Sequence, residues 1–109
     1  MADITVQVTF DQNAQPQFTF APDPARMNAA GKVILNRNGS TAWTFTGAFV
    51  KNDTIGQFTV SVNPGGQVVQ ITDAFRQMGT YGYRVTVTQN GRSFTSPDPE
   101  IVNEPSQGS

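Results

Sequence analysis

The pattern that most constrains this chain is a strict alternation of apolar and polar residues, repeated in short stretches along its length. In DITVQVTF every second residue from Ile4 to Phe10 is apolar, and the residues between them are threonine or glutamine. QFTVSVN and TYGYRVTVTQ follow the same rule. Because successive side chains of a β-strand point to opposite faces, this period predicts strands with one buried and one solvated face. Such strands are typical of antiparallel sheets.

Turn sequences separate the alternating stretches. Asn38-Gly39 and Asn90-Gly91 suit tight hairpins, because both residue types tolerate a positive φ, and Pro64–Gly66 breaks the chain between two further stretches. We therefore expect eight or nine short strands, at residues 3–10, 17–20, 32–36, 41–50, 57–63, 67–71, 80–89, 92–96 and 100–103. This spacing predicts an all-β fold, a two-layer antiparallel β-sandwich with an immunoglobulin-like or cupredoxin-like Greek key.

The core of this sandwich is predicted to consist of inward-facing apolar residues from both sheets. These are Ile4, Val6, Phe18, Trp43, Phe45, Phe58, Val60, Tyr81, Tyr83 and Val85. Burial of one large apolar side chain contributes about 1.5–3 kcal/mol. Replacement of Trp43 by alanine is therefore expected to cost about 3–5 kcal/mol of stability.

One helical turn is expected near residues 73–78, within DAFRQMG. Asp73 suits its N-cap, and Gly79 suits its end. The strand that follows contains Tyr81 and Tyr83. It resembles the corner of immunoglobulin-like sandwiches, in which a tyrosine hydroxyl bonds back to upstream backbone, and also the GTYxY strand of cupredoxins.

The length of 109 residues predicts one domain at residues 1–105, followed by a disordered tail, SQGS, at 106–109. The chain has no cysteine and therefore no disulfide. Its N-terminus shows no basic region with an apolar stretch of secretory length, and no run approaches the roughly 18 apolar residues of a membrane span. We therefore expect a cytoplasmic protein that does not associate with membranes.

The missing residue types narrow the chemistry. Histidine and cysteine are both absent. A blue-copper site needs two imidazoles and a thiolate, so the likeness to cupredoxins brings no copper site with it. Ser-His-Asp and Cys-His nucleophiles and ordinary zinc sites are excluded for the same reason, and no Walker or GxGxxG loop occurs. We expect no enzyme, no cofactor, no metal site and no catalytic residues.

Carboxylates offer the remaining alternatives. In an extended segment Asp98 and Glu100 would project from one face, about 7 Å apart, which is a separation that glycosidase acid pairs use. A hydrolase that uses these two groups is therefore an alternative. Asp11 to Asn13 supply oxygen ligands for calcium but lack the spacing of an EF-hand loop, and the simpler interpretation is an Asx turn between strands.

The charge balance disfavours nucleic acid as a partner. Seven basic residues stand singly among eight acidic ones, the net charge is −1, and no basic stripe forms. A row of threonines is expected on one outer sheet face, where it could bind a flat polymer or a protein. This row comprises Thr44, Thr46, Thr86 and Thr88.

A carbohydrate-binding module, assisted by calcium, is a further alternative. It requires at least two aromatic side chains on one solvent-exposed face, because sugars stack on aromatic rings. The candidates are Trp43, Tyr81 and Tyr83.

Two Pro-Asp-Pro triplets, Pro22–Pro24 and Pro97–Pro99, allow an architectural and a functional interpretation. Proline fixes its own φ and lacks a backbone donor, so each triplet is a stiff crossing or protects a sheet edge from pairing with another chain. The functional alternative is a rigid acidic segment that recognises a basic partner. That segment consists of Asp98, Pro99, Glu100, Glu104 and Pro105.

The stretch SPDPEIVNEP, preceded by GTYGYRVTVTQNGRSFTS, resembles the DP-EP family of small bacterial proteins, whose label matches the pairs Asp98-Pro99 and Glu104-Pro105. The resemblance is clearest from Gly79 to Pro105. It implies a single cytoplasmic domain of cupredoxin-like or immunoglobulin-like sandwich form, and it supplies no catalytic residues. We therefore expect a non-catalytic module that works through a protein partner or through self-association of sheet edges or faces.

Overall fold

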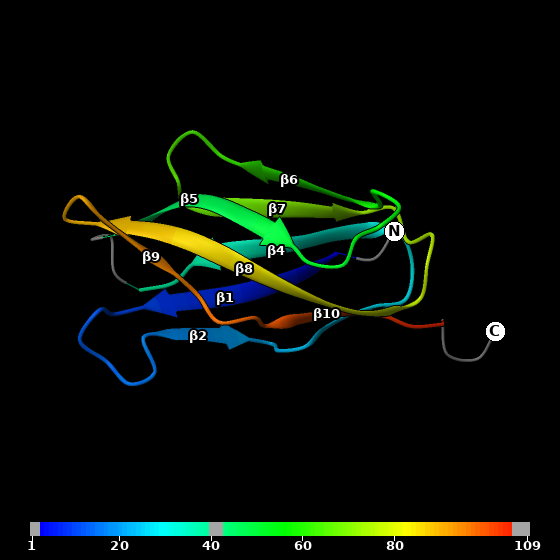
Figure 1. Ribbon diagram of the computed structural model, residues 1–109, viewed down its shortest axis with the longest axis horizontal. Helices are drawn as coiled ribbons and strands as arrows, with labels where there is room; N and C mark the ends of the chain where they lie inside the picture. The colour runs from blue at the N-terminus through cyan, green and yellow to red at the C-terminus, as the bar shows by residue number, and fades with distance from the viewer. Residues whose placement is uncertain (1–2, 40–42, 106–109) are drawn as a thin grey trace.

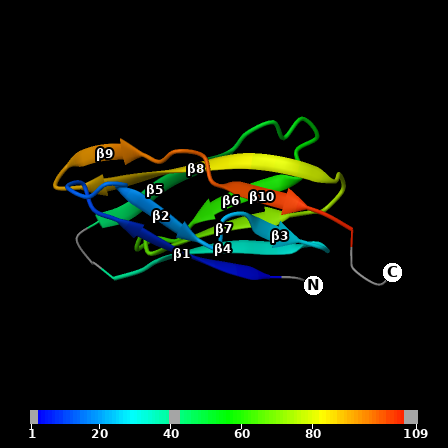
Figure 2. The same cartoon turned by 90° about the horizontal axis from the view of Figure 1, so that it is seen from below.

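A computed structural model describes residues 3–39 and 43–105 of the chain, and these residues form ten β-strands and no helix. The strands build two sheets that pack face to face (Figures 1 and 2). The prediction of an all-β, two-layer sandwich is therefore confirmed. Within the described ranges there is also no helix of the length and hydropathy that a membrane span requires.

The first sheet has the strand order β2-β1-β4-β7-β6. Its strands are β1 (Ile4–Phe10), β2 (Phe18–Ala21), β4 (Gly31–Arg37), β6 (Phe58–Val62) and β7 (Val68–Asp73). β1 and β4 are parallel, and the other neighbours are antiparallel. β2 and β6 are the two edges of this sheet.

The second sheet has the order β3-β10-β8-β5, and β9 pairs with β8 as well. Its strands are β3 (Ala25–Met27), β5 (Trp43–Val50), β8 (Gly79–Gln89), β9 (Arg92–Thr95) and β10 (Glu100–Asn103). β5 pairs with β8 along one edge of that strand. On the other side β10 pairs with the beginning of β8 and β9 pairs with its end, so these two short strands follow one another along the same neighbour.

The sheets are mixed, so the prediction of purely antiparallel sheets was wrong. β1 is parallel to β4, and β3 is parallel to β10. Alternation reports that one face of a strand is buried, and it does not report the direction of the neighbouring strand. The count of strands also exceeds the eight or nine predicted, because the short strand β3, which directly follows Pro24, was not recognised.

The core lies between the two sheets and is formed by the inward-facing residues of most strands. The buried apolar residues are Val6, Val8, Phe10, Phe18, Ala25, Met27, Val33, Leu35, Trp43, Phe45, Val50, Val69, Ile71, Tyr81, Tyr83, Val85, Val87 and Ile101. Trp43 packs edge-on against Phe45, with ring centroids 5.0 Å apart. Of the residues predicted for the core, Ile4, Phe58 and Val60 are only half-buried.

Residues 74–78 form an irregular loop, and the helical turn predicted near residues 73–78 is not present. Asp73 Oδ1 accepts a hydrogen bond from the main-chain N–H of Phe75 at 2.8 Å, and Phe75 adopts a left-handed φ of 58°. Gln57 Oε1 accepts from the main-chain N–H groups of Arg76 and Gln77, at 2.9 and 3.1 Å. These side-chain acceptors satisfy the local N–H groups and so replace the helical pattern.

Tyr81 completes this corner of the sandwich. Its hydroxyl donates to the carbonyl of Gln77 at 3.3 Å and accepts from Gln57 Nε2 at 2.9 Å, so the predicted back-bonding tyrosine is present. The hydroxyl of Tyr83, in contrast, is buried and has no hydrogen-bond partner among the described residues. Of the two tyrosine hydroxyls on β8, that of Tyr81 is therefore hydrogen-bonded, whereas that of Tyr83 has no partner among the described residues.

The predicted hairpin at Asn90-Gly91 is confirmed. Both residues have a positive φ, 54° and 75°, and they join β8 to β9. Gly39 also has a positive φ of 82°. The residues that follow it, 40–42, and the predicted tail at 106–109 lie outside the described part of the chain.

Candidate functional site

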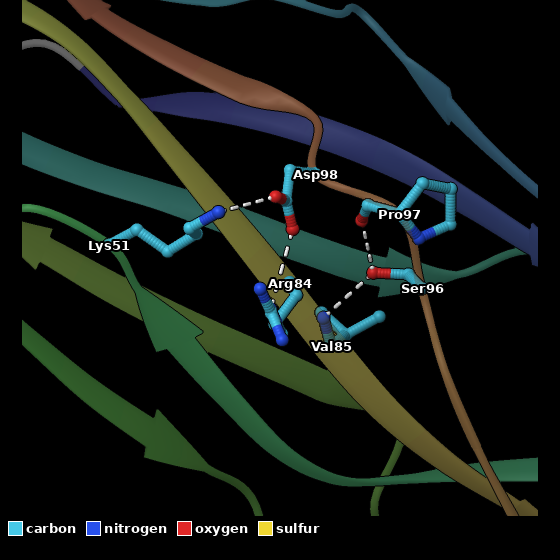
Figure 3. Close-up of polar contacts among 6 residues, drawn as sticks. All are labelled: Lys51, Arg84, Val85, Ser96, Pro97 and Asp98. Atoms are coloured by element: carbon cyan, nitrogen blue, oxygen red, sulfur yellow. Dashed lines mark hydrogen bonds and ion pairs between the residues drawn. The ribbon is translucent and has the colours of Figure 1, made fainter.

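The second Pro-Asp-Pro triplet, Pro97–Pro99, connects β9 to β10, and the chain stays hydrogen-bonded to β8 on both sides of it. The main-chain N–H of Ser96 donates to Val85 O at 2.9 Å, and that of Tyr83 donates to Pro99 O at 2.8 Å. Ser96 Oγ accepts from the N–H of Val85 at 2.9 Å and lies 2.7 Å from Pro97 O, as Figure 3 shows. The triplet therefore interrupts the strand but preserves the ladder on both sides of it.

Asp98, at the tip of this interruption, lies over β8 between two cations (Figure 3). Its Oδ2 lies 2.8 Å from Lys51 Nζ, and its Oδ1 lies 3.4 Å from Arg84 Nε. The hydrogen bond from Lys51 is the main reason that the pKa of Asp98 lies below its ordinary value of 3.8, and Arg84 adds to this effect. Asp98 therefore forms ion pairs with Arg84 of β8 and with Lys51, which directly follows β5.

The first Pro-Asp-Pro triplet, Pro22–Pro24, contacts Glu100, the residue that follows the second triplet. Asp23 Oδ1 accepts a hydrogen bond from the main-chain N–H of Glu100 at 3.0 Å, at the point where β10 begins. Two residues after Asp23, β3 pairs with β10 in the register Ala25 to Ile101. Both aspartates between prolines thus fix the path of the chain around β10, which supports the architectural interpretation of the triplets.

The predicted acidic recognition segment is largely paired within the chain. Asp98 is bound to Lys51 and Arg84, and Glu104 Oε1 lies 2.9 Å from Arg26 Nη1 on β3. The other members of the segment differ in exposure: Pro99 is buried, and Glu100 and Pro105 are exposed.

The hydrolase alternative gains no support from the surroundings of Asp98 and Glu100. Three surface hollows lie along β5, β6 and β7 and beside the ends of β4 and β7, and neither carboxylate lines any of the three. A general acid also needs a raised pKa, whereas that of Asp98 is lowered.

Phe49 is the most exposed large apolar residue of the described chain, with 58% of its surface accessible. It lies on the outer face of β5 directly opposite Arg84 of β8. Lys51 follows two residues later, and Asp98 binds both cations. We call the surface formed by Phe49, Lys51, Arg84 and Asp98 the Phe49 face.

The exposure of Phe49 results from a β-bulge in β5. The register with β8 shifts between Phe45 and Gly47. Before the shift odd-numbered residues such as Trp43 and Phe45 point inward, and after it Val50 does, so Phe49 points outward. Sequence analysis missed Phe49 because it assumed an unbroken alternation, although a glycine inside a strand is a known signal of a bulge.

The calcium and threonine candidates from the sequence have the following positions in the structure. Asp11 Oδ1 accepts from the main-chain N–H of Asn13 at 2.9 Å, which is the Asx turn. No group of three or more candidate metal-binding side chains was found within the described ranges. Thr44 lies opposite Thr88 on the outer face of β5 and β8.

The aromatic platform that a carbohydrate-binding module needs is not formed by the three predicted residues. Trp43 is 1% exposed, Tyr81 6% and Tyr83 0%, so all three belong to the core. Their rings pack against other aromatic rings: Trp43 against buried Phe10, Tyr81 against half-buried Phe58, and Tyr83 against half-buried Phe20.

Comparison with known proteins agrees with the resemblance seen at the C-terminal end. The chain matches the DP-EP family over residues 2–105, which is most of its length. The chain therefore belongs to the DP-EP family. A comparison with curated proteins gave no significant match.

Proposed function

We propose that this member of the DP-EP family is a non-catalytic module that binds a protein partner through its Phe49 face. The observation that supports the proposal best is the position of Phe49. A large apolar ring is 58% exposed on the outer face of β5, the edge strand of the second sheet, opposite Arg84 of β8 rather than at a loop tip. A bulge in β5 turns this ring outward.

Two residues of this face, Phe49 and Arg84, are of the types on which protein interfaces depend most. Aromatic residues and arginine are enriched among the side chains that dominate binding energy. Phe49 and Arg84 lie on paired strands, and Asp98 restrains the Arg84 and Lys51 side chains. A restrained side chain loses less entropy on binding.

The charges indicate the chemistry of the partner. Lys51 and Arg84 contribute two positive charges and Asp98 one negative charge, so the face has a local excess of one positive charge. A partner that fits would offer an apolar pocket for Phe49 and an acidic rim, because complementary charge at the rim favours encounter and register.

A non-catalytic role is supported by the absence of histidine and cysteine from the sequence. The one carboxylate on the Phe49 face, Asp98, is engaged by Lys51 and has a lowered pKa, which suits a fixed charge better than a proton donor.

Quantitative capture from host extract tests the proposal. The wild-type chain and the variants Phe49→Thr and Ile55→Thr are immobilised, and retained proteins are quantified by mass spectrometry. Ile55 is a matched control, because it is 48% exposed and lies in the loop between β5 and β6. A genuine partner should be retained by wild type and by Ile55→Thr. Phe49→Thr should raise the dissociation constant of this partner about 30-fold, as expected for a loss of about 2 kcal/mol at a dominant contact.

The captured partner is then purified, and its affinity for each variant is measured by calorimetry. Equal retention of every captured protein by wild type and Phe49→Thr would contradict the proposal, as would the capture of no protein at all. Phe49→Thr should fold like the wild type, since substitution of an exposed side chain changes the free energy of unfolding by about 0.5 kcal/mol or less.

A further inference from the structure

Strand β6 is an edge of the first sheet whose backbone is open along its outer side. It pairs only with β7, and it runs along the upper margin of the ribbon in Figure 1. Gln57 O accepts from Ala74 N, and Asn63 N donates to Val68 O, so odd-numbered residues of this segment turn their backbone groups toward β7. The even-numbered residues, from Phe58 to Val62, therefore turn theirs outward.

One of these outward groups has its own partner. The N–H of Phe58 donates to Asp53 Oδ2 at 2.9 Å. The groups that remain for another strand are the N–H and C=O of Val60, the N–H and C=O of Val62, and the C=O of Phe58. This is the hydrogen-bonding pattern that an added antiparallel strand would complete.

The other edges of the two sheets carry protective features in the strand or beside it, whereas β6 carries them only at its ends, where Asp53 binds the N–H of Phe58 and Pro64 follows Asn63. Prolines and charged side chains are the usual protective devices at sheet edges. The devices found here are Pro16 and Pro22 around β2, Pro24 and Arg26 at β3, Arg92 and Pro97 at β9, and the bulge together with the Phe45 N to Gly66 O bond at β5. The stretch Phe58–Val62 contains neither proline nor a charged residue.

The inward side chains of β6 are also less covered than those of its neighbour. Val69 and Ile71 of β7 are fully buried, with 0% of their surface exposed. Phe58, Val60 and Val62 point to the same layer but are only half-buried, although they pack against the core. A strand added beyond β6 would cover them.

We propose that β6 pairs with β6 of a second copy of this chain, antiparallel about a two-fold axis through Val60. In this register Val60 faces its own counterpart, Phe58 faces Val62 on the inner side, and Thr59 faces Ser61 on the outer side. Each contact joins like with like, apolar to apolar and hydroxyl to hydroxyl. Because Phe58–Val62 contains no charged residue, no like charges face each other within the paired strands, and the charge bound to this edge is that of Asp53 at the N–H of Phe58.

The backbone groups fit the same register. The two copies of Val60 exchange a pair of N–H to O bonds, and the N–H of each Val62 reaches the C=O of Phe58 in the other copy. The C=O of each Val62 faces the Phe58 N–H of the other copy, which Asp53 Oδ2 occupies at 2.9 Å, so Asp53 has to turn away for the strands to pair at this position. The two first sheets then form one continuous sheet, with the second sheets on its same side. This pairing uses a different surface from the Phe49 face and does not depend on it.

A charge-reversal pair tests the proposed register directly. Sedimentation velocity over a range of concentrations is applied to the wild-type chain, to Thr59→Lys with Ser61→Lys, and to Thr59→Lys with Ser61→Glu. The all-lysine variant places like charges opposite each other and should weaken dimerisation at least tenfold. The mixed variant places each lysine opposite a glutamate and should dimerise about as well as the wild type.

Hydrogen exchange supplies the second readout. In the dimer the amides of Val60 and Val62 should become protected as the protein concentration rises, while that of Phe58 should not change. A wild-type chain that remains monomeric at millimolar concentration would overturn the proposal, and so would a dimer that persists in the all-lysine variant. Failure of the mixed variant to dimerise would also overturn it. Phe49→Thr should dimerise normally, so the two proposals stand or fall separately.

Discussion

Asp23 accepts a hydrogen bond from the main-chain N–H of Glu100 at 3.0 Å, although 77 residues separate them in the sequence. The acceptor lies between two prolines, and the donor directly follows the second Pro-Asp-Pro triplet. Because the prolines on both sides of Asp23 restrict its backbone, the carboxylate is presented to β10 with few conformations to lose on folding. The two triplets are thus parts of one structural device at the start of β10.

Replacement of Asp23 by alanine should lower the free energy of unfolding by about 1–2 kcal/mol, because a charge-assisted hydrogen bond is lost at an exposed site. Asp23→Asn should cost less, since the amide oxygen still accepts the bond. Urea denaturation measures both. Glu100→Gln is the matched control, because only the backbone of Glu100 takes part, and it should stay within about 0.5 kcal/mol of wild type. Equal stability of Asp23→Ala and wild type would show that the bond contributes nothing.

The carboxyl group of Asp98 should titrate below its ordinary pKa of 3.8, and carbon-detected NMR can follow it. Since the folded-state pKa is lowered, the stabilisation from this group is present above the pKa of the unfolded chain and is lost as the pH falls through the folded pKa. Lys51→Met should raise the Asp98 pKa toward its ordinary value, and Arg84→Gln should raise it less, because Arg84 is the weaker partner. A larger effect from Arg84→Gln would contradict this ranking.

Tyr81 and Tyr83 provide a matched pair, because only one of their hydroxyls is bonded. Tyr81→Phe removes the bonds to Gln57 and Gln77 and should cost about 1–2 kcal/mol in urea denaturation. Tyr83→Phe removes a buried hydroxyl that has no partner among the described residues, and it should be neutral or stabilising. If Tyr83→Phe costs as much as Tyr81→Phe, the hydroxyl of Tyr83 has a partner that the described residues do not include.

Most of the fold could be predicted because it depends on local rules. The alternation in β1 and β8 follows from burial of one face, and the Asn90-Gly91 turn follows from its tolerance of positive φ. The helical turn near Asp73 was predicted wrongly, since Gln57, a residue far away in sequence, supplies the acceptor that changes the backbone of that loop. A local rule cannot include such a distant partner.

The candidate site was less predictable for the same reason. Asp98 was singled out from its prolines, but its partners are Arg84 of β8 and Lys51 just after β5, and only the pairing of these strands brings them together. Phe49 was overlooked because a single extra residue in β5 reverses the face on which every later side chain lies. The bulge lies between Phe45, which was predicted for the core and is buried, and Phe49, which is the most exposed large apolar residue described.

Asp73 offers the last test, since it is a fully buried carboxyl without a cationic partner in the described residues. Its Oδ1 accepts from Phe75 and from Asn103 Nδ2, and its Oδ2 has no partner among those residues. Burial raises the pKa of Asp73 above 3.8, and the negative charge of Asp53 acts in the same direction, although the two hydrogen bonds oppose them. The folded chain therefore binds a proton here more tightly than the unfolded chain does.

The stabilisation from that proton is complete below the pKa of the unfolded chain and is lost as the pH rises through the folded pKa. Asp73→Asn keeps an acceptor for Phe75 and does not titrate, so its stability relative to wild type should rise between pH 3.5 and pH 7. Urea midpoints measured at both pH values give this difference, and comparison within each pH cancels the other titrating groups. A relative stability that is constant or falls over this range would show that burial of Asp73 does not disfavour its charge.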